Sequence, residues 1–258
     1  MRMFTRALVR PPAATFAQGL TTAGLGPPDL SKALLQHARY VAALEECGLA
    51  VITLPPDPAF PDSTFVEDTA VLVPDLAIVT RPGASSRAGE TAAVRRALAP
   101  LFEELREIEP PGTLDGGDVC VAGEHAFIGV SERTNPEGAR QLAGLLIARG
   151  FDSTIVDVRG STALLHLKSG LAWVGGRRLI AVESLRSHPS LRGWEIVVVA
   201  RAEDYAANCV LLGDRVLVAA GFPKISSTLR ELGLRPFEID TSEFRKMDGG
   251  PSCLSLRF

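Results

Sequence analysis

This sequence has no long apolar run, no leader-like N-terminus and no closely spaced cysteines. No apolar stretch reaches the roughly 18–20 residues of a membrane-spanning helix, and Arg6 and Arg10 interrupt the one apolar stretch near the start. We therefore expect neither a membrane partner nor a cleaved signal peptide. The four cysteines form no Cys-x-x-Cys pair, which argues against a disulfide scaffold and a cysteine-rich zinc site. These absences favour a reduced, cytoplasmic protein.

Surplus positive charge is absent as well. The chain has 27 Lys and Arg against 30 Asp and Glu, a formal net charge of −3. Nucleic acids and anionic membranes attract basic surfaces, so we expect neither as a partner. Only four histidines are present, and without a cluster of histidines or cysteines we expect no metal site.

The sequence is instead rich in short apolar runs that recur in pairs. Its 258 residues, 46% of them hydrophobic, can form one large domain or two small ones. Two runs separated by two or three turn-forming residues predict a β-hairpin. We place four hairpins, at 69–73 with 76–80, 118–122 with 126–130, 171–174 with 178–182, and 209–212 with 215–219.

A helix and a further strand follow most of these hairpins. Apolar residues at helical spacing predict helices at Ser31–Cys47, Arg87–Leu105, Pro136–Arg149 and Pro223–Leu232. The glycine that follows three of these helices suits a left-handed C-cap. Strands are predicted next, at Ala50–Leu54, Ser153–Val158 and Leu234–Ile239. The third unit offers only a short helix candidate at 183–190.

The elements thus repeat as units of strand, strand, helix and strand. A fifth unit would begin near Cys253, where too little chain remains to complete it, and an unused strand at Met3–Val9 can supply the missing part. We therefore predict an α/β fold of five pseudo-fivefold ββαβ units, closed by pairing of the N- and C-terminal strands. The whole of residues 1–258 would form a single domain. The alternative is a mixed α/β sheet whose periodicity is coincidental.

Residues that can carry out chemistry lie at the starts of the predicted hairpins, which should meet at one end of the ring. Cys253 follows a Gly-Gly-Pro-Ser turn that leaves its thiol uncrowded, as a nucleophile requires. His166 is the one histidine directly before a hairpin, and Asp115 has a corresponding place in the second unit. We predict that Asp115 orients and charges His166, and that His166 is the partner of Cys253. The simpler alternatives are a buried structural thiol and a solvated histidine.

Charged side chains of both signs stand near the same hairpins. Asp62, Glu67 and Asp68 form an acidic group that matches a planar guanidinium cation. Arg87 and Arg133 come just after the first two hairpins and, if they point inward, suit a substrate carboxylate. Each set could also be an ordinary solvated surface. Together with a thiol and an imidazole, these charges predict a site for an arginine-like zwitterion.

Seven segments spread over the chain make the most specific pattern in the sequence. They are LPPDPAFPDSTFVEDTAV (54–71), TRPGASSR (80–87), TLDGGDV (113–119), GVSERTN (129–135), LLHLKSG (164–170), AANCV (206–210) and MDGGPSCLSLRF (247–258). In this order they resemble the dimethylarginine dimethylaminohydrolase family of the guanidine-modifying superfamily. The resemblance implies a five-bladed α/β propeller, the pentein fold. It also implies a hydrolase that converts asymmetric dimethylarginine or monomethylarginine to citrulline and dimethylamine or methylamine.

The resemblance also implies a role for each candidate residue. It makes Cys253 the nucleophile, His166 the general acid and base, and Asp115 the support of the histidine. The implied substrate contacts are Glu67 and Asp68 to the guanidinium, Asp62 and the backbone carbonyl of Leu20 to the α-amino group, Arg87 and Arg133 to the α-carboxylate, and the main chain of Met247 to the guanidine end.

The implied reaction passes through a covalent thiouronium-type intermediate on the cysteine and needs no metal or organic cofactor. The long loop Ala17–Pro28 is a candidate lid over the substrate, or else a plain surface connection. Two other functions stay open: another guanidine hydrolase, such as an arginine deiminase-like enzyme, and a non-catalytic binding ring, because the fold alone does not make an enzyme. The sequence leaves a homodimer open.

Overall fold

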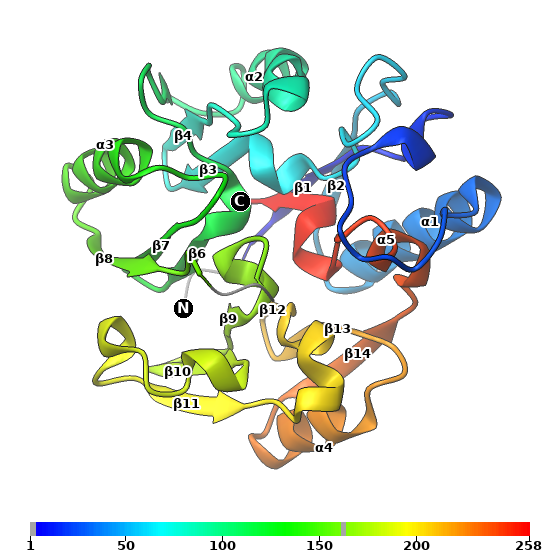
Figure 1. The fold of residues 1–258 in the computed structure, drawn as a ribbon, viewed down its shortest axis with the longest axis vertical. Helices are drawn as coiled ribbons and strands as arrows, with labels where there is room; N and C mark the ends of the chain where they lie inside the picture. The colour runs from blue at the N-terminus through cyan, green and yellow to red at the C-terminus, as the bar shows by residue number, and fades with distance from the viewer. Residues whose placement is uncertain (1–3, 161–163) are drawn as a thin grey trace.

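Within residues 4–160 and 164–258, which this computed structural model describes, fifteen short strands form five three-stranded sheets around a common axis (Figure 1). In the order of the sheets they are β3 (Ala70–Val73), β4 (Leu76–Val79) and β5 (Glu104–Glu107); β6 (Val119–Ala122), β7 (His125–Val130) and β8 (Asp152–Asp157); β9 (Leu171–Trp173), β10 (Arg178–Ala181) and β11 (Glu195–Val198); β12 (Val210–Leu212), β13 (Arg215–Ala219) and β14 (Arg235–Ile239); and β15 (Ser255–Arg257), β1 (Arg6–Val9) and β2 (Ala50–Thr53).

All five sheets share one connectivity, so the predicted ββαβ repeat is confirmed. The first strand of each sheet is antiparallel to the middle one, and the third is parallel to it. A parallel neighbour requires a crossover connection. In four sheets a helix supplies it, namely α1 (Leu30–Glu46), α2 (Thr91–Leu98), α3 (Pro136–Ile147) and α4 (Pro223–Glu231). The third sheet uses two 3-10 turns instead, η6 (Glu183–Leu185) and η7 (Pro189–Leu191).

Both ends of the chain complete the fifth sheet, as predicted. Strand β15 is antiparallel to β1, with Leu8 opposite Leu256, and β1 is parallel to β2. The backbone N–H of Phe258 donates to the carbonyl of Arg6 at 3.0 Å. Met3, the first residue of the predicted strand, lies outside the described residues. The pairing closes the ring without an open edge between the termini.

The helix predicted for Arg87–Leu105 is wrong in its extent. The chain there forms a 3-10 turn, η3 (Ser85–Glu90), then α2, and then strand β5. Pro100 stops the helix because it cannot donate a backbone hydrogen bond. The residues of β5, Glu-Leu-Arg-Glu, are charged except for one leucine and carry no apolar strand pattern, yet they pair with β4 along its whole length. Pairing in the folded sheet has overridden the local signal.

The helix starts follow the capping chemistry of the sequence. The side chain of Asp29 accepts a hydrogen bond from the N–H of Lys32 at the start of α1. Asn135 does the same for Gly138 at the start of α3, where Pro136 occupies the first turn. These caps satisfy backbone donors that have no partner within the helix.

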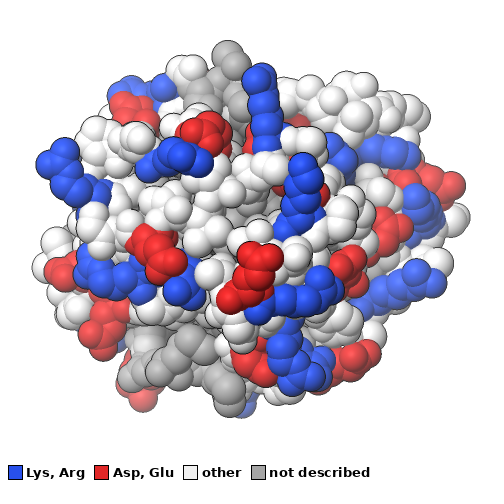
Figure 2. Space-filling model, turned by 90° about the horizontal axis from the view of Figure 1, so that it is seen from below, with Lys and Arg blue, Asp and Glu red and all other residues white. Residues whose placement is uncertain are grey.

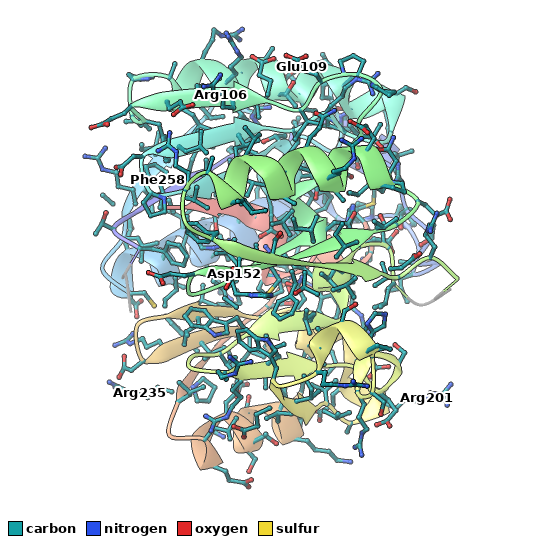
Figure 3. All side chains as sticks on the ribbon, turned by 90° about the vertical axis from the view of Figure 1, so that its left-hand side faces the viewer. Arg106, Glu109, Asp152, Arg201, Arg235 and Phe258 are labelled. Carbon is teal, nitrogen blue, oxygen red and sulfur yellow. The ribbon has the colours of Figure 1, made fainter. Side chains whose placement is uncertain are left out.

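Seen from the side, the ring has two different ends (Figure 3). The third strands of the second and fourth sheets begin at one face, marked by Asp152 and Arg235, where Phe258 also lies. Arg201, which begins the turn leading to β12, lies at the opposite face. On the side shown in Figure 2, basic and acidic side chains are interspersed. No helix in the described part of the chain is long and apolar enough to cross a membrane.

Candidate active site

Five 3-10 turns stand at the starts of the five inner strands and meet around the axis. They are η2 (Val66–Thr69), η4 (Gly116–Asp118), η5 (Leu167–Ser169), η8 (Arg201–Ala207) and η9 (Pro251–Leu254). The segments that the sequence analysis selected as hairpin starts lie in these turns or directly beside them. The turns of neighbouring units are packed together, since η2 contacts η4 and η9, and η5 contacts η4 and η8.

Side chains of three turns bind the backbone of the next turn in the same way. Oδ1 of Asp68 accepts from the N–H of Gly117 at 2.9 Å, and Oδ1 of Asp118 accepts from that of Leu167 at 2.9 Å. Farther round the ring, Oδ1 of Asn208 accepts from the N–H of Ser252 at 2.9 Å. These bonds fix each turn against its neighbour.

Two further contacts close this circle of turns. The side-chain amide of Asn208 donates to the carbonyl of Lys168 at 2.9 Å. The hydroxyl of Ser252 donates to Oε2 of Glu67 at 2.6 Å. Side-chain contacts therefore link all five units, which holds groups from distant parts of the sequence in fixed positions around the axis.

The circle of turns separates two cavities. The first, of about 150 Å³, is lined by Leu20, Thr21, Thr22, Asp62, Phe65, Asp68, Arg87, Asp115, Arg133, Leu165, His166, Met247, Asp248, Gly249 and Cys253. Nine of the ten predicted site residues are among them. The second cavity, of about 140 Å³, lies along the inner strands and contains Glu67, Lys168, Ser252 and Arg257. We call them the thiol cavity and the axial cavity.

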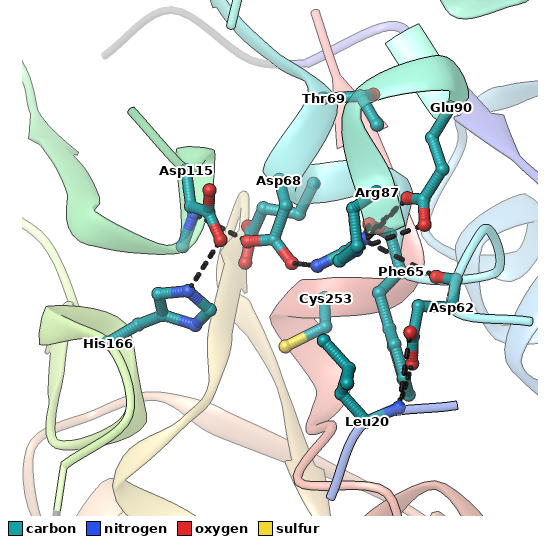
Figure 4. A network of polar contacts seen from close by, with 12 residues as sticks. Leu20, Asp62, Phe65, Asp68, Thr69, Arg87, Glu90, Asp115, His166 and Cys253 are labelled. Carbon is teal, nitrogen blue, oxygen red and sulfur yellow. Dashed lines mark hydrogen bonds and ion pairs between the residues drawn. The ribbon is translucent and has the colours of Figure 1, made fainter. Parts of the chain in front are cut away.

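In the thiol cavity, His166 and Asp115 form a buried pair (Figure 4). Nε2 of the imidazole is 3.0 Å from Oδ2 of Asp115, and the other carboxylate oxygen accepts from the N–H of Gly83 at 2.9 Å. Burial alone would lower the pKa of His166, but the carboxylates of Asp68, Asp115 and Asp118 outweigh it and raise the pKa to about 9. At neutral pH the histidine is therefore a proton donor.

Cys253 lies in turn η9, whose preceding Gly-Gly segment brings the backbone close to its neighbours. A Cβ added to Gly249 would lie 2.2 Å from the ring of Phe65, so only glycine fits there. The N–H of Gly250 lies 3.4 Å from Sγ of Cys253. Burial and the charges of Glu67 and Asp68 raise the pKa of this thiol to about 12. Without a cation in the cavity, Cys253 is therefore a thiol rather than a thiolate.

The other cysteines lie outside the thiol cavity, and none of the four is in a disulfide. Cys120 and Cys209 are buried beside the axial cavity, where burial raises their pKa values to about 11 and about 12. Cys47 follows α1, and burial raises its pKa as well. Among the cysteines, only Cys253 shares a cavity with His166.

Asp68 and Arg87 form a buried ion pair beside the thiol (Figure 4). Nη1 of Arg87 donates to Oδ2 of Asp68 at 2.5 Å, its Nε and Nη2 donate to Glu90, and Nη2 also donates to the carbonyl of Phe65. Four of the five guanidinium N–H groups thus face protein oxygens, and one on Nη1 remains for a substrate. Burial lowers the pKa of Arg87, but the two carboxylates outweigh it and raise it well above the ordinary value.

Arg133 differs from Arg87 because its guanidinium lines the cavity without a hydrogen bond or ion pair to another described residue. Its backbone N–H is held by the hydroxyl of Ser131 at 3.0 Å. A cation that faces a cavity and lacks a carboxylate partner is suited to bind an anionic ligand. Within the described residues, Arg133 therefore keeps its whole guanidinium for a ligand, whereas Arg87 keeps one N–H.

The loop that contains Leu20 forms the rim of the cavity, and hydrogen bonds from three consecutive residues hold it, including one from the hydroxyl of Thr21 to the carbonyl of Lys246 at 2.8 Å. The N–H of Leu20 donates to Asp62 at 3.1 and 3.2 Å. The N–H of Thr22 donates to the carboxylate of Asp248 at 2.6 Å. Met247, the residue before Asp248, is buried against the same cavity. The predicted contacts from Leu20, Asp62 and Met247 therefore come from one rim.

Glu67 is the one predicted site residue that the structure does not place in the thiol cavity. Its carboxylate accepts from Lys168, from Arg257 at 2.8 Å and from Ser252 at 2.6 Å, all on the axial side. In a 3-10 turn, consecutive side chains point in directions about 120° apart. Glu67 and Asp68 consequently face opposite cavities, and the expectation that both carboxylates hold one guanidinium does not fit this geometry.

Sequence reasoning assigned no role to four buried polar residues around the site: Glu90, Asp118, Asn208 and Ser252. Asp118 and Ser252 lie inside the motifs TLDGGDV and MDGGPSC, and Asn208 lies in AANCV. A signal for them was therefore present, because polar residues directly before buried strands need partners. Glu90 precedes an ordinary amphipathic helix and carries no such signal.

The ligand atoms of Asp68, Asp115 and His166 lie within 4.8 Å of one another. Such a set can in principle bind a metal ion. Here the histidine bonds Asp115 and Asp68 bonds Arg87, so each member already has a charged partner inside the protein.

The sequence of this chain is similar to those of known enzymes along almost its whole length. A dimethylarginine dimethylaminohydrolase of Pseudomonas aeruginosa is 43% identical over 99% of this chain and 100% of its own length. The chain belongs to the dimethylarginine dimethylaminohydrolase family. A member from Streptomyces coelicolor is 39% identical, over 98% of this chain and 96% of that protein. The arginine deiminase family model also matches, over residues 97–185.

Solved structures agree with this membership of the dimethylarginine dimethylaminohydrolase family. The structure of a cysteine-to-serine variant of the Pseudomonas aeruginosa enzyme, complexed with citrulline, superimposes with a TM-score of 0.96 at 42% identity and full coverage of both chains. The N-terminal domain of ArgZ, an arginine dihydrolase from cyanobacteria, has a TM-score of 0.86 at 17% identity, covering 98% of this chain and 96% of that one. The fold is the five-bladed α/β propeller of the guanidine-modifying superfamily.

Proposed function

We propose that this protein hydrolyses Nω-methylated arginine to citrulline and methylamine or dimethylamine, with Cys253 as the nucleophile. One observation carries the proposal: a single cavity of about 150 Å³ contains a thiol, a charged imidazole, carboxylates and a guanidinium that no described carboxylate pairs. These groups match the carbon, the leaving amine, the cation and the carboxylate of such a substrate. The bound citrulline of the Pseudomonas relative supports this assignment.

The charges of the cavity set the orientation of the substrate. Arg133, with the remaining N–H of Arg87, binds the α-carboxylate, while Asp62 and the carbonyl of Leu20 bind the α-amino group. Asp68 binds the guanidinium at the inner end, near Cys253 and the main chain of Met247. Charge-assisted hydrogen bonds of this kind are stronger than neutral ones and fix direction.

The first half of the reaction transfers the amidine carbon to sulfur. The positive guanidinium offsets the carboxylates that disfavour a thiolate, so Cys253 loses its proton to solvent when the substrate binds. The thiolate attacks the guanidinium carbon and forms a C–S bond. His166 donates its proton to the dimethylamino nitrogen, the C–N bond breaks, and dimethylamine leaves. A thiouronium cation remains on Cys253 and His166 is neutral.

The second half adds water and returns the cysteine. Neutral His166 takes a proton from water as the oxygen attacks the thiouronium carbon. The C–S bond then breaks, the sulfur leaves as the thiolate, and the hydroxyl proton is lost as the ureido group of citrulline forms. The net reaction consumes one water and releases one amine for each citrulline. Asp115 keeps the imidazole oriented in both halves.

The test is an assay with four substrates. The purified protein is offered asymmetric dimethylarginine, monomethylarginine, arginine and agmatine, and citrulline and the released amine are measured. We expect citrulline and dimethylamine in equal amounts from asymmetric dimethylarginine. A protein that turns over neither methylated arginine would contradict the proposal.

The second candidate function is that of an arginine deiminase-like enzyme. It is favoured by the match of that family over residues 97–185. The same residues would act on unmethylated arginine and release ammonia. The assay separates the two functions, because a deiminase prefers arginine over its methylated forms. Agmatine is disfavoured in either case, since it has no carboxylate for Arg133.

We also infer that the protein acts as one domain in a reducing, cytoplasmic compartment. Four free thiols support the compartment, and the pairing of both termini in one sheet supports the single domain. A homodimer is not needed for the site, because all its named residues come from one chain. Sedimentation analysis measures whether two copies associate.

A further inference from the structure

Asp118 is a fully buried carboxylate that borders neither cavity. Its relative exposure is 0%. Oδ1 accepts from the N–H of Leu167 at 2.9 Å, and Oδ2 accepts from the hydroxyls of Ser131 at 2.7 Å and Thr134 at 2.6 Å. Burying a charge without partners is costly, and these three donors compensate for it. None of the partners is itself a charged group.

The partners of Asp118 lead to three groups of the thiol cavity. Leu167 directly follows His166 in the chain. The hydroxyl of Ser131 accepts from the backbone N–H of Arg133 at 3.0 Å. The hydroxyl of Thr134 accepts from the backbone N–H of Asp115 at 3.1 Å. One carboxylate thus connects the segments that hold the histidine, its carboxylate partner and the free arginine.

The packing around this carboxylate allows little movement. A Cβ added to Gly129 on β7 would lie 2.8 Å from Oδ1 of Asp118 and 2.9 Å from Cβ of Leu167. Such distances are below ordinary contact, so the backbone of β7 approaches Asp118 as closely as glycine permits. The carboxylate therefore lies close against β7 and turn η5.

We propose that Asp118 is a positioning residue, which fixes His166, Asp115 and Arg133 as one rigid unit and stabilises the charged form of the histidine. This inference rests on the proposed function, because it gives those three residues their roles. Asp118 does not touch the substrate. It acts through Leu167, Ser131 and Thr134, and its negative charge adds to the field at the imidazole.

The electrostatic part of the proposal involves few groups. The ionisable side chains that face His166 are Asp68 from η2, Asp115 and Asp118 from the η4 segment, and Cys253 from η9. Burial raises the pKa of Asp118, but the charge of His166 and the three donors oppose this effect. The carboxylate and the imidazolium therefore stabilise each other's charge.

The decisive variant is Asp118→Asn, which keeps the shape and removes the charge. Oδ1 can still accept from Leu167, and the hydroxyls of Ser131 and Thr134, which donate to Oδ2 in the parent, can both turn to accept from the new amide. We expect the alkaline limb of the kcat profile, measured at saturating substrate, to move down by about one pH unit, because a carboxylate that stabilises the imidazolium is gone. We expect kcat to fall roughly tenfold or more, with a smaller change in KM.

A matched control is Glu203→Gln. Glu203 is also a buried carboxylate that accepts backbone N–H bonds, from Lys224 at 3.0 Å and Ile225 at 2.8 Å, but it caps α4 away from the thiol cavity. This variant should lose thermal stability and keep the parent pH profile. If Asp118→Asn behaved as Glu203→Gln does, losing stability with an unchanged profile, Asp118 would be merely structural and the proposal would fail.

Two smaller substitutions test the links separately if Asp118→Asn does not fold. Ser131→Ala removes the acceptor for the N–H of Arg133 and should raise KM several-fold with little effect on kcat. Thr134→Val removes the acceptor for the N–H of Asp115 and should lower kcat instead. Equal effects of both variants on kcat and KM would contradict the assignment of separate links.

The inference can fail independently of the proposed function. The titration of His166, followed by NMR of its ring proton without substrate, does not depend on turnover. A lower midpoint in Asp118→Asn than in the parent supports the proposal even for a different substrate. An unchanged midpoint overturns it even if methylated arginines are hydrolysed.

Discussion

The two cavities beside the circle of turns contain similar residue types, but they differ in whether the charged side chains are paired within the protein. In the axial cavity, Glu67 is bound by Lys168, Arg257 and Ser252, so every charge is matched within the protein. In the thiol cavity, the guanidinium of Arg133 has no hydrogen-bond or ion-pair partner among the residues that the structure describes, and Cys253 lines the cavity beside it. Residues adjacent in the sequence line different cavities. Glu67 and Ser252 line the axial cavity, whereas Asp68 and Cys253 line the thiol cavity.

This difference indicates which polar residues act on a ligand. Buried charges that are already paired stabilise the fold, whereas an unpaired charge beside a cavity is retained at a cost and marks binding. Residue type alone does not distinguish a charged side chain that stabilises the fold from one that binds a ligand. Substitutions on the axial side should therefore lower stability and leave turnover nearly unchanged, whereas substitutions on the thiol side should lower turnover.

The largest contrast is expected between two cysteines. Replacing Cys253 by serine should lower kcat by roughly 10⁴-fold or more, since it removes the nucleophile. Replacing Cys209, which lines the axial cavity, by serine should leave kcat nearly unchanged and reduce stability by about 1–3 kcal/mol, because a hydroxyl is buried. Steady-state assays and thermal unfolding of both variants measure this. Comparable activity losses would break the contrast.

The next contrast is between Asp68 and Glu67. Asp68→Asn should lower kcat/KM by roughly 10²-fold, because it removes the carboxylate that binds the guanidinium. It should also lower stability, because the buried Arg87 loses a partner. Glu67→Gln should reduce the free energy of unfolding by about 3–5 kcal/mol, since Lys168 and Arg257 lose their partner. Urea unfolding and kinetics on the same preparations separate these outcomes. A Glu67→Gln protein with normal stability and a strongly raised KM would show that Glu67 binds substrate directly.

A third contrast concerns the two arginines. Arg133→Ala should lower kcat/KM for methylarginine by roughly 10–100-fold, the value of one or two charge-assisted bonds, with stability nearly unchanged. Arg87→Ala should also destabilise the fold, because it leaves Asp68 and Glu90 buried and unpaired. Thermal unfolding distinguishes them. An unchanged Tm in Arg87→Ala would contradict the role of Arg87 in the buried ion-pair network.

The smallest effects concern pH. With the pKa of His166 at about 9, kcat at saturating substrate should fall as the pH rises through about 9. Cys253 is already a thiolate in that complex, and the histidine no longer protonates the amine. The folded pKa lies above the unfolded value of about 6.5. Its contribution to stability is therefore fully present below pH 6.5 and is lost as the pH rises toward 9. A profile that increases steadily beyond pH 9 would contradict a protonated histidine.

Much of this arrangement follows from the sequence. The hairpin repeat placed β3, β6, β9 and β12 within two residues, because alternating apolar runs and turn residues are local signals. Closure by the termini followed from counting units. The exact extent of the second helix did not follow, since β5 has no apolar pattern and forms only through pairing with β4.

The sequence indicated which residues lie near the site better than it indicated where their side chains point. Cys253, His166 and Asp115 share positions at unit starts, so topology alone brings them together. The direction of Glu67 depends on the rotation within one 3-10 turn, and the partners of Arg87 depend on Glu90, which precedes a helix of ordinary composition. Such contacts arise from tertiary packing and leave no local trace.

The most direct test of the account is to trap the covalent intermediate during turnover. The protein is mixed with asymmetric dimethylarginine, quenched with acid within milliseconds, digested and analysed by mass spectrometry. The account predicts one modified peptide, carrying Cys253 with the mass of the substrate less dimethylamine, and unmodified peptides for Cys47, Cys120 and Cys209. Release of dimethylamine and citrulline with no adduct at any quench time, or an adduct on another cysteine, would contradict it.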